Sequence, residues 1–166
     1  MKKIIAVDPG WGGALAYYIP DDKILGLSLC PGDCLGMLDY LSTLQNKYGR
    51  EGWLAVLENN HSSPIFGARG NFGLGVNIGS WEAALSCHNI PIEYVEAKDW
   101  QKPTTHERSS VKKGRKAVKE KSWRYARKHY PMFRATLGDS VPSLKSPRQG
   151  KADALCLLRY VRREGR

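Results

Sequence analysis

Residues 3–8, Lys-Ile-Ile-Ala-Val-Asp, form a short β-branched apolar run that stops at Pro9-Gly10. A second apolar run, Ala-Leu-Ala-Tyr-Tyr-Ile, follows two glycines and ends at residue 19, and a third spans 23–29 after a Pro-Asp-Asp turn. Short apolar runs separated by Gly, Pro and Asp are typical of strands joined by tight turns. The opening of the chain therefore predicts three strands paired as an antiparallel meander.

The rest of the chain alternates between helical and strand patterns. Helices are predicted over 34–48 with Gly32 or Asp33 as cap, over 71–88, from Ser109 or Ser110 to about 129, and over 151–163. Strands are predicted over 53–58 and 91–96, with loops over 59–70 and 133–149. Strands that alternate with helices favour parallel crossovers. We therefore expect one α/β domain over 1–166, with a five-stranded mixed sheet and helices on both faces.

The composition points to a polyanionic partner. Twenty-six Lys and Arg against sixteen Asp and Glu give a net charge of +10. A positive balance of this kind favours a nucleic-acid partner. The alternative is that the charge serves solubility alone. No apolar run reaches the roughly 18 residues that span a bilayer, so we expect no membrane segment. The four cysteines are spread out and fit no disulfide framework, which favours reduced thiols in a cytosolic setting.

The positive charge is concentrated in one segment. Between Lys102 and Lys128 eleven Lys and Arg face only Glu107 and Glu120, which gives +9 of the total. A solvated helix face would explain such a run, but in this chain we favour contacts with DNA phosphates. Binding of that kind is expected to weaken steeply with salt.

Three acids stand at the ends of predicted elements. Asp8 and Glu58 each end an apolar strand, and Asp153 falls in the first turn of the last helix. Singly, they are explained as a turn cap, a surface charge and an acid favoured by the helix dipole. Together they suggest a Mg²⁺ site, because Mg²⁺ prefers oxygen ligands. Two such ions about 3.5–4 Å apart can hydrolyse a phosphodiester, so a basic protein with this cluster is a nuclease candidate.

Five ordered blocks of the sequence resemble a known family. They are Ile-Ala-Val-Asp-Pro-Gly-Trp-Gly-Gly-Ala-Leu-Ala at 5–16, Leu-Glu at 57–58, and the segments 71–79, 90–100 and 151–155. In this order they resemble the RuvC family of Holliday-junction resolvases, and most of all its bacteriophage-type and chloroplast members. The first block alone is weak evidence, whereas the ordered set covers most of the chain.

The resemblance implies an RNase H-like fold and a homodimer that places two active sites on a four-way DNA junction. Each site would nick one of two like strands with Mg²⁺ and water and leave a 5′-phosphate; two ions are expected, and Mn²⁺ can substitute. Asp8, Glu58 and Asp153 match the metal-binding acids. We expect a cytoplasmic protein of a bacterial or phage-infected cell, with an organellar location left open by the chloroplast members.

One departure from the family pattern concerns the metal. RuvC proteins usually carry a fourth ligand three residues before the last acid, where this chain has Gly150. Phage-type sequences can also have Gly there, and Asp139 is a weak substitute. The catalytic lysine is also open: Lys102 is our first candidate and Lys98 its rival, and either could be an ordinary contact with the DNA backbone.

Several residues are assigned to DNA binding or to the dimer. In the loop after Glu58, Phe66 would stack on an unpaired base or anchor the loop, and His61 is more simply a polar loop residue than a proton carrier. The predicted DNA contacts are Ser62, Ser63, Phe66, Arg69, Lys98, Lys112, Lys113, Arg115, Lys116, Lys119 and Lys151. By the resemblance, the dimer interface contains Phe72, Gly75 and Gly79.

Other functions remain open at this point. A different RNase H-like nuclease would act on hybrids, flaps or forks, and only a comparison of substrates separates it from a resolvase. A non-catalytic DNA-binding module is suggested by Gly150. An actin-like sugar kinase also opens with an Asp-x-Gly phosphate loop, but it needs two lobes, for which 166 residues are too few.

Overall fold

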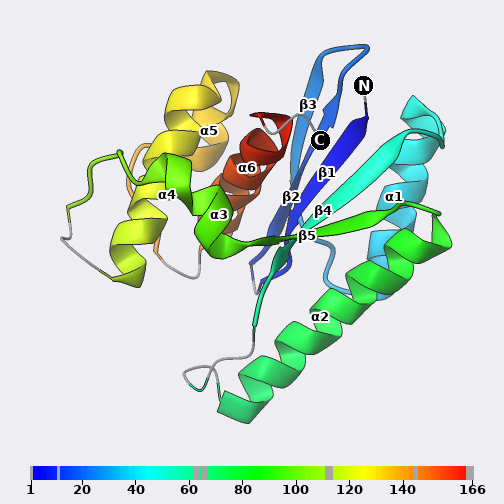
Figure 1. The fold of residues 1–166 in the computed structure, drawn as a ribbon, viewed down its shortest axis with the longest axis horizontal. Coiled ribbons are helices and arrows are strands. Elements are labelled where there is room, and N and C mark those ends of the chain that lie inside the picture. The colour runs from blue at the N-terminus through cyan, green and yellow to red at the C-terminus, as the bar shows by residue number, and fades with distance from the viewer. Residues whose placement is uncertain are drawn as a thin grey trace.

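A five-stranded sheet forms the centre of the computed structural model, which describes residues 2–10, 12–61, 64, 67–110, 114–143 and 146–163 (Figure 1). Its strands are β1 (Lys3–Asp8), β2 (Ala14–Ile19), β3 (Ile24–Leu29), β4 (Trp53–Asn59) and β5 (Ile92–Glu96). The order across the sheet is β3-β2-β1-β4-β5. The first three strands are antiparallel, whereas β1, β4 and β5 are parallel. The predicted meander and mixed sheet are both confirmed.

Helices cover both faces of this sheet, as predicted (Figure 1). One face carries α1 (Cys34–Tyr48) and α2 (Gly67–Cys87). The other carries the remaining helices, which are α3 (Ala97–Gln101), α4 (Arg115–His129), α5 (Arg134–Leu137) and α6 (Pro147–Arg163), with short 3₁₀ turns at Lys102–Thr104 and Pro131–Phe133.

Alternate residues of the central strands divide the core into two parts. In β1, Ile5 and Val7 pack with α1 and α2, whereas Ile4 and Ala6 pack with α4 and α6. This division follows from the strand period of two. Asp8 is next in the row of Ile4 and Ala6, so the same alternation directs it toward the α6 side of the sheet.

Small side chains bring α6 close to the sheet. Ala6, Ala14 and Ala16 line the strand surface, and Ala152 and Ala154 face them from the helix, all fully buried. Because these side chains are short, the two elements pack closely, and nearly all residues of α6 from Gln149 to Leu158 are buried. An acid on this part of the helix is therefore buried as well.

Three helices begin at residues other than those predicted. α2 and α6 begin at 67 and 147, each four residues before the predicted starts at 71 and 151. α4 begins at 115, after Gly114, and not behind Ser109 or Ser110. The hydroxyl oxygens of these two serines lie 3.0 and 2.7 Å from Oε2 of Glu120. The side chains predicted to cap α4 instead tie the preceding loop to the middle of that helix.

Candidate active site

Asp8 and Glu58 end neighbouring parallel strands on the same face of the sheet. The register pairs Val7 with Leu57, so the two acids are the next residues along β1 and β4. Asp8 is 8% exposed and Glu58 is 7% exposed. The two carboxyl groups influence each other: the charge of Asp8 raises the pKa of Glu58, and the side chain of Glu58 lowers that of Asp8.

Asp153 reaches the same region from α6 and is held there by α4. Its side chain is fully buried. Ser122 Oγ donates to Asp153 Oδ1 over 2.6 Å, and Gln149 Nε2 donates to the same oxygen over 3.1 Å. The ammonium group of Lys119 forms an ion pair with Oδ2. Both carboxylate oxygens are thus engaged, which fixes the orientation of the side chain.

Burial and mutual repulsion make the strand acids hard to ionise. Burial is the main cause that raises the pKa of Asp8 to about 6 and that of Glu58 to about 8, with Asp153 adding to both shifts and Lys119 opposing them. The indole N–H of Trp100 also lowers the pKa of Glu58. This buried group forms no hydrogen bond that meets the usual distance and angle limits. For Lys119, burial favours the neutral amine, but the three acids outweigh it and raise its pKa. Lys119 is therefore the counter-ion of the cluster.

The chemistry of this cluster fits a hard divalent cation. Three buried carboxyl groups, of which Asp8 and Glu58 have raised pKa values, gain from a nearby cation, and Mg²⁺ prefers such oxygen donors. Gln149 adds a buried amide oxygen that accepts no hydrogen bond. Within the described part of the chain, however, no three Asp, Glu, His or Cys side chains surround a common point. Metal binding thus requires Lys119 to share or leave its position on Asp153.

The close approach of Gly150 to Gly12 explains why position 150 does not carry an acid. A Cβ atom at this position would lie 2.2 Å from the carbonyl oxygen of Gly12, far inside van der Waals contact. Glycine is therefore needed where α6 passes the turn between β1 and β2. Asp139, the suggested substitute, does not join the cluster: its side chain is 99% exposed and pairs with Arg127.

Lys119 is the lysine that lies among the acids. Lys102 Nζ is 2.9 Å from Asp99 Oδ1 with its side chain 74% exposed, and Lys98 is exposed on α3. A catalytic role for either stays a prediction. Lys119 lies three residues before Ser122 and shares its helix face, but nothing else in the sequence sets it apart from the other bases of α4. The charges around the rest of α4 hid that pattern.

The predicted DNA contacts are only partly within the described residues. Arg115 and Lys116 are exposed on the first turn of α4, Arg69 is exposed on α2, and Lys151 is half-buried on α6. His61 Nε2 lies 3.1 Å from Glu96 Oε2. The predicted contacts outside the described residues are Ser62, Ser63, Phe66, Lys112 and Lys113.

The outer side of α2 carries an exposed apolar row. Phe72 is 75% exposed and Val76 is 52% exposed. A Cβ atom at Gly75 or Gly79 would meet nothing within 4 Å. These glycines are not required by packing within the chain, so their side of α2 is open to a partner.

Solved structures share this architecture. RuvC of Thermus thermophilus in complex with a Holliday junction substrate aligns over 98% of this chain and 96% of its own, with a TM-score of 0.54 and 10% sequence identity. Another T. thermophilus RuvC structure aligns over the same shares, with a TM-score of 0.53 and 14% identity. No protein-family model and no curated protein matches the sequence.

At these identities the likeness is one of fold. It extends over nearly the whole length of both chains. The chain therefore has a RuvC-like fold of the RNase H-like class.

Proposed function

We propose that this protein is a divalent-metal-dependent endonuclease that resolves four-way DNA junctions by nicking two like strands and leaving 5′-phosphate ends. The observation that carries the proposal is the meeting of Asp8, Glu58 and Asp153 at one corner of a RuvC-like fold. The basic helix α4 lies against that corner through Lys119. Acids suited to Mg²⁺ beside a cationic surface favour hydrolysis of a nucleic-acid backbone.

The three acids would hold the cation, with Mn²⁺ able to replace Mg²⁺. The bound metal would supply Lewis acidity and lower the pKa of the attacking water. Ser122 and Gln149 fix the direction of the Asp153 carboxylate. Lys119 balances the acids from within, and the 18% exposure of its side chain allows the ammonium to meet a phosphate from the surface.

A homodimer would supply the two sites that paired nicks require. The row of Phe72, Gly75, Val76 and Gly79 on α2 is the proposed interface, because it is apolar, exposed and open. A two-fold symmetric dimer places the same patch of both chains in contact. Sedimentation of the purified protein measures this assembly directly.

The first experiment compares an end-labelled synthetic four-way junction with a linear duplex of matching sequence, in Mg²⁺ and in EDTA. Paired nicks near the branch point that need the metal and are absent from the duplex are the expected result. Flaps, forks and RNA–DNA hybrids in the same assay distinguish a resolvase from another RNase H-like nuclease. Preferred cutting of any of these substrates would replace the junction as the proposed target.

The non-catalytic DNA-binding module is the second candidate. Lys119 already neutralises Asp153, and Gly150 excludes a side chain where a fourth acid would stand. Tight binding of the junction without cuts in either Mg²⁺ or Mn²⁺ is the result that would favour this alternative.

A further inference from the structure

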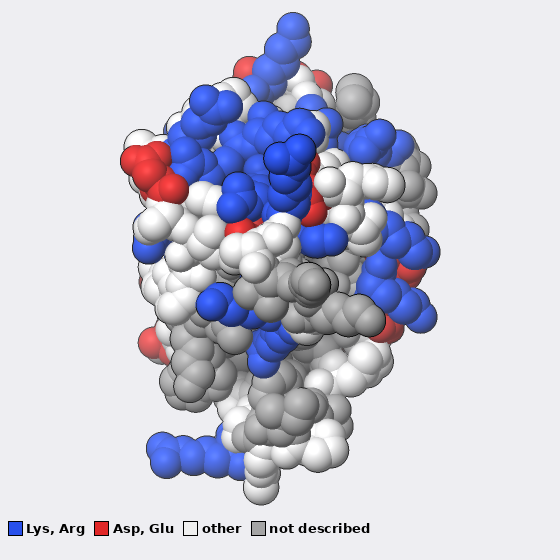
Figure 2. All heavy atoms as spheres, turned by 90° about the vertical axis from the view of Figure 1, so that its left-hand side faces the viewer, with Lys and Arg blue, Asp and Glu red and all other residues white. Residues whose placement is uncertain are grey.

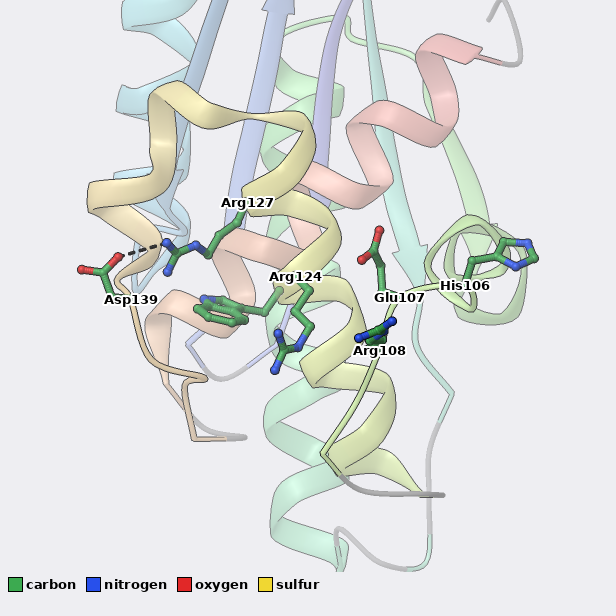
Figure 3. A pocket seen from close by; sticks show the side chains of 7 residues that line it. His106, Glu107, Arg108, Arg124, Arg127 and Asp139 are labelled. Atoms are coloured by element: carbon green, nitrogen blue, oxygen red, sulfur yellow. Dashed lines mark hydrogen bonds and ion pairs between the residues drawn. The ribbon is translucent and has the colours of Figure 1, made fainter.

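A second charged region lies on α4, apart from the three acids. It is a hollow of about 570 Å³ between α4 and the loop that precedes it, and none of the three acids lines it (Figure 3). Its walls include Arg108, Arg124, Arg127, Trp123, Glu107 and Asp139, and we name this region the arginine hollow. Figure 2 shows Lys and Arg gathered on the side of the molecule where α4 and α5 lie.

Two guanidinium groups of the arginine hollow are held in place by the protein. The Arg127 guanidinium lies 4.9 Å from the centre of the Trp123 ring, and one of its nitrogens donates to the carbonyl oxygen of Gly138. Arg124 donates twice to Glu120 Oε1, over 3.1 and 2.8 Å. Guanidinium groups fixed in this way lose little side-chain entropy when they bind a phosphate, whose oxygens match their paired donors.

Asp139 occupies a position where a phosphate oxygen would meet Arg127. Its Oδ1 accepts from Arg127 over 3.0 Å, yet the side chain is 99% exposed (Figure 3). Ion pairs of such exposed groups contribute about 0–1 kcal/mol. An incoming phosphate can therefore replace this carboxylate at little expense, and Asp139 stands in for the anion while the site is free.

The chemistry of the walls and their distance from the acids indicate which anion fits. Pockets for small molecules are mostly apolar, whereas charged side chains dominate here. Arg127 follows Lys119 by eight residues, which is about 12 Å along a helix. A phosphate in the arginine hollow is thus not the one at the acids but another along the same nucleic acid.

We propose that the arginine hollow binds a backbone phosphate of a DNA duplex arm beside the junction, and that this phosphate displaces Asp139 from Arg127. The inference rests on the proposed function, because it takes DNA as the substrate. It gives Asp139 a role in binding, in place of the metal-ligand role considered from the sequence.

The test measures the affinity of the full-length protein for a four-way junction in EDTA at several salt concentrations. Joint replacement R124A/R127A is expected to weaken binding about 10- to 100-fold and to lower the salt slope by about one to two. D139N is expected to tighten binding about three- to tenfold, because the competing carboxylate is gone. D22N makes the same charge change as D139N, and R50A removes one of the two positive charges that R124A/R127A removes, both at exposed positions away from α4.

R124A/R127A and D139N are expected to change the affinity in opposite directions, and this distinguishes a binding site from a structural ion pair. If Arg127 and Asp139 only stabilised the fold, D139N would leave affinity equal to that of D22N, and this result would overturn the proposal. An R124A/R127A variant no weaker than R50A would overturn it as well. Asp139 is nearly fully exposed, so D139N gives an answer even if the double replacement fails to fold.

Failure of the arginine hollow and failure of the proposed nuclease are told apart by a parallel assay in Mg²⁺. If cutting is normal and the variants bind the junction as tightly as their controls, only the arginine hollow is rejected. The expected affinity changes with no cutting reject the nuclease alone and support a site for the DNA arm.

Discussion

Helix α4 forms two ion pairs with aspartates that differ in burial and in consequence. Lys119 and Asp153 are 18% and 0% exposed, and Asp153 also accepts hydrogen bonds from Ser122 and Gln149. Arg127 is 22% exposed, but its partner Asp139 is 99% exposed. The cations are similarly enclosed, so the aspartates make the difference.

This difference separates a fixed charge from an exchangeable one. Removing a partner from a buried pair leaves an uncompensated charge in the interior, whereas water replaces the partner in an exposed pair. We therefore assign the first pair to the framework of the candidate active site and the second to a position that an anion can take over.

The largest expected effect is on cleavage. Asp153→Asn keeps the shape of the side chain but removes the charge that would hold the metal, so junction cutting should fall at least about 10³-fold while binding in EDTA remains. Asp8→Asn and Glu58→Gln should behave alike. Asp22→Asn, in the exposed turn between β2 and β3, is the control. If Asp139→Asn abolished cutting and Asp153→Asn did not, the assignment of Lys119–Asp153 to the candidate active site would be wrong.

The next effect is on stability. Lys119→Met leaves Asp153 buried without its cation and should lower the free energy of unfolding by about 3–5 kcal/mol at neutral pH in EDTA. Asp139→Asn should change it by less than about 1 kcal/mol. Urea denaturation measures both changes in the free energy of unfolding, provided that the m value is the same for each variant and the wild type. Equal losses in the two variants would show that burial does not separate the pairs.

A third effect follows from the raised pKa of Glu58. Its carboxyl keeps a proton up to about pH 8 in the folded state but loses it near 4.5 in the unfolded chain. Between these values the unfolded state binds fewer protons, so stability of the metal-free protein should fall as pH rises, by a total of roughly 3–5 kcal/mol. Glu58→Gln should abolish most of that fall and match the wild type near pH 4. A wild-type stability that rises from pH 5 to pH 8 would contradict this expectation.

The sequence predicts the sheet well because its signals are local. β1 and β2 are short apolar runs cut by Pro and Gly, and the Asp33 cap of α1 is confirmed by a hydrogen bond of 2.8 Å from Gly36 N. The start of α4 was missed because Ser109 and Ser110 bond to Glu120, eleven and ten residues away. A partner at that distance leaves no periodic trace in the sequence.

The acids of the candidate site were predictable because they end strands, whereas their partners were not. Asp8 and Glu58 stand where apolar runs stop, and parallel pairing then places them side by side. Lys119 was grouped with the other bases of α4, because only the packing of α4 against α6 distinguishes it. The reason for Gly150 is equally non-local, since it depends on the backbone of Gly12.

The smallest effect concerns Gly150, whose close approach to Gly12 sets how deeply the first turn of α6, and with it Asp153, is buried. Gly150→Ala forces the backbones apart and should lower the free energy of unfolding by about 1–3 kcal/mol. Gly32→Ala, where nothing lies within 4 Å, should change it by less than about 0.5 kcal/mol. Gly150→Asp should destabilise at least as much as Gly150→Ala and leave Mg²⁺ affinity, measured by calorimetry, no higher than in the wild type. Tighter Mg²⁺ binding in Gly150→Asp would mean that the turn at Gly12 can yield and admit a fourth acid.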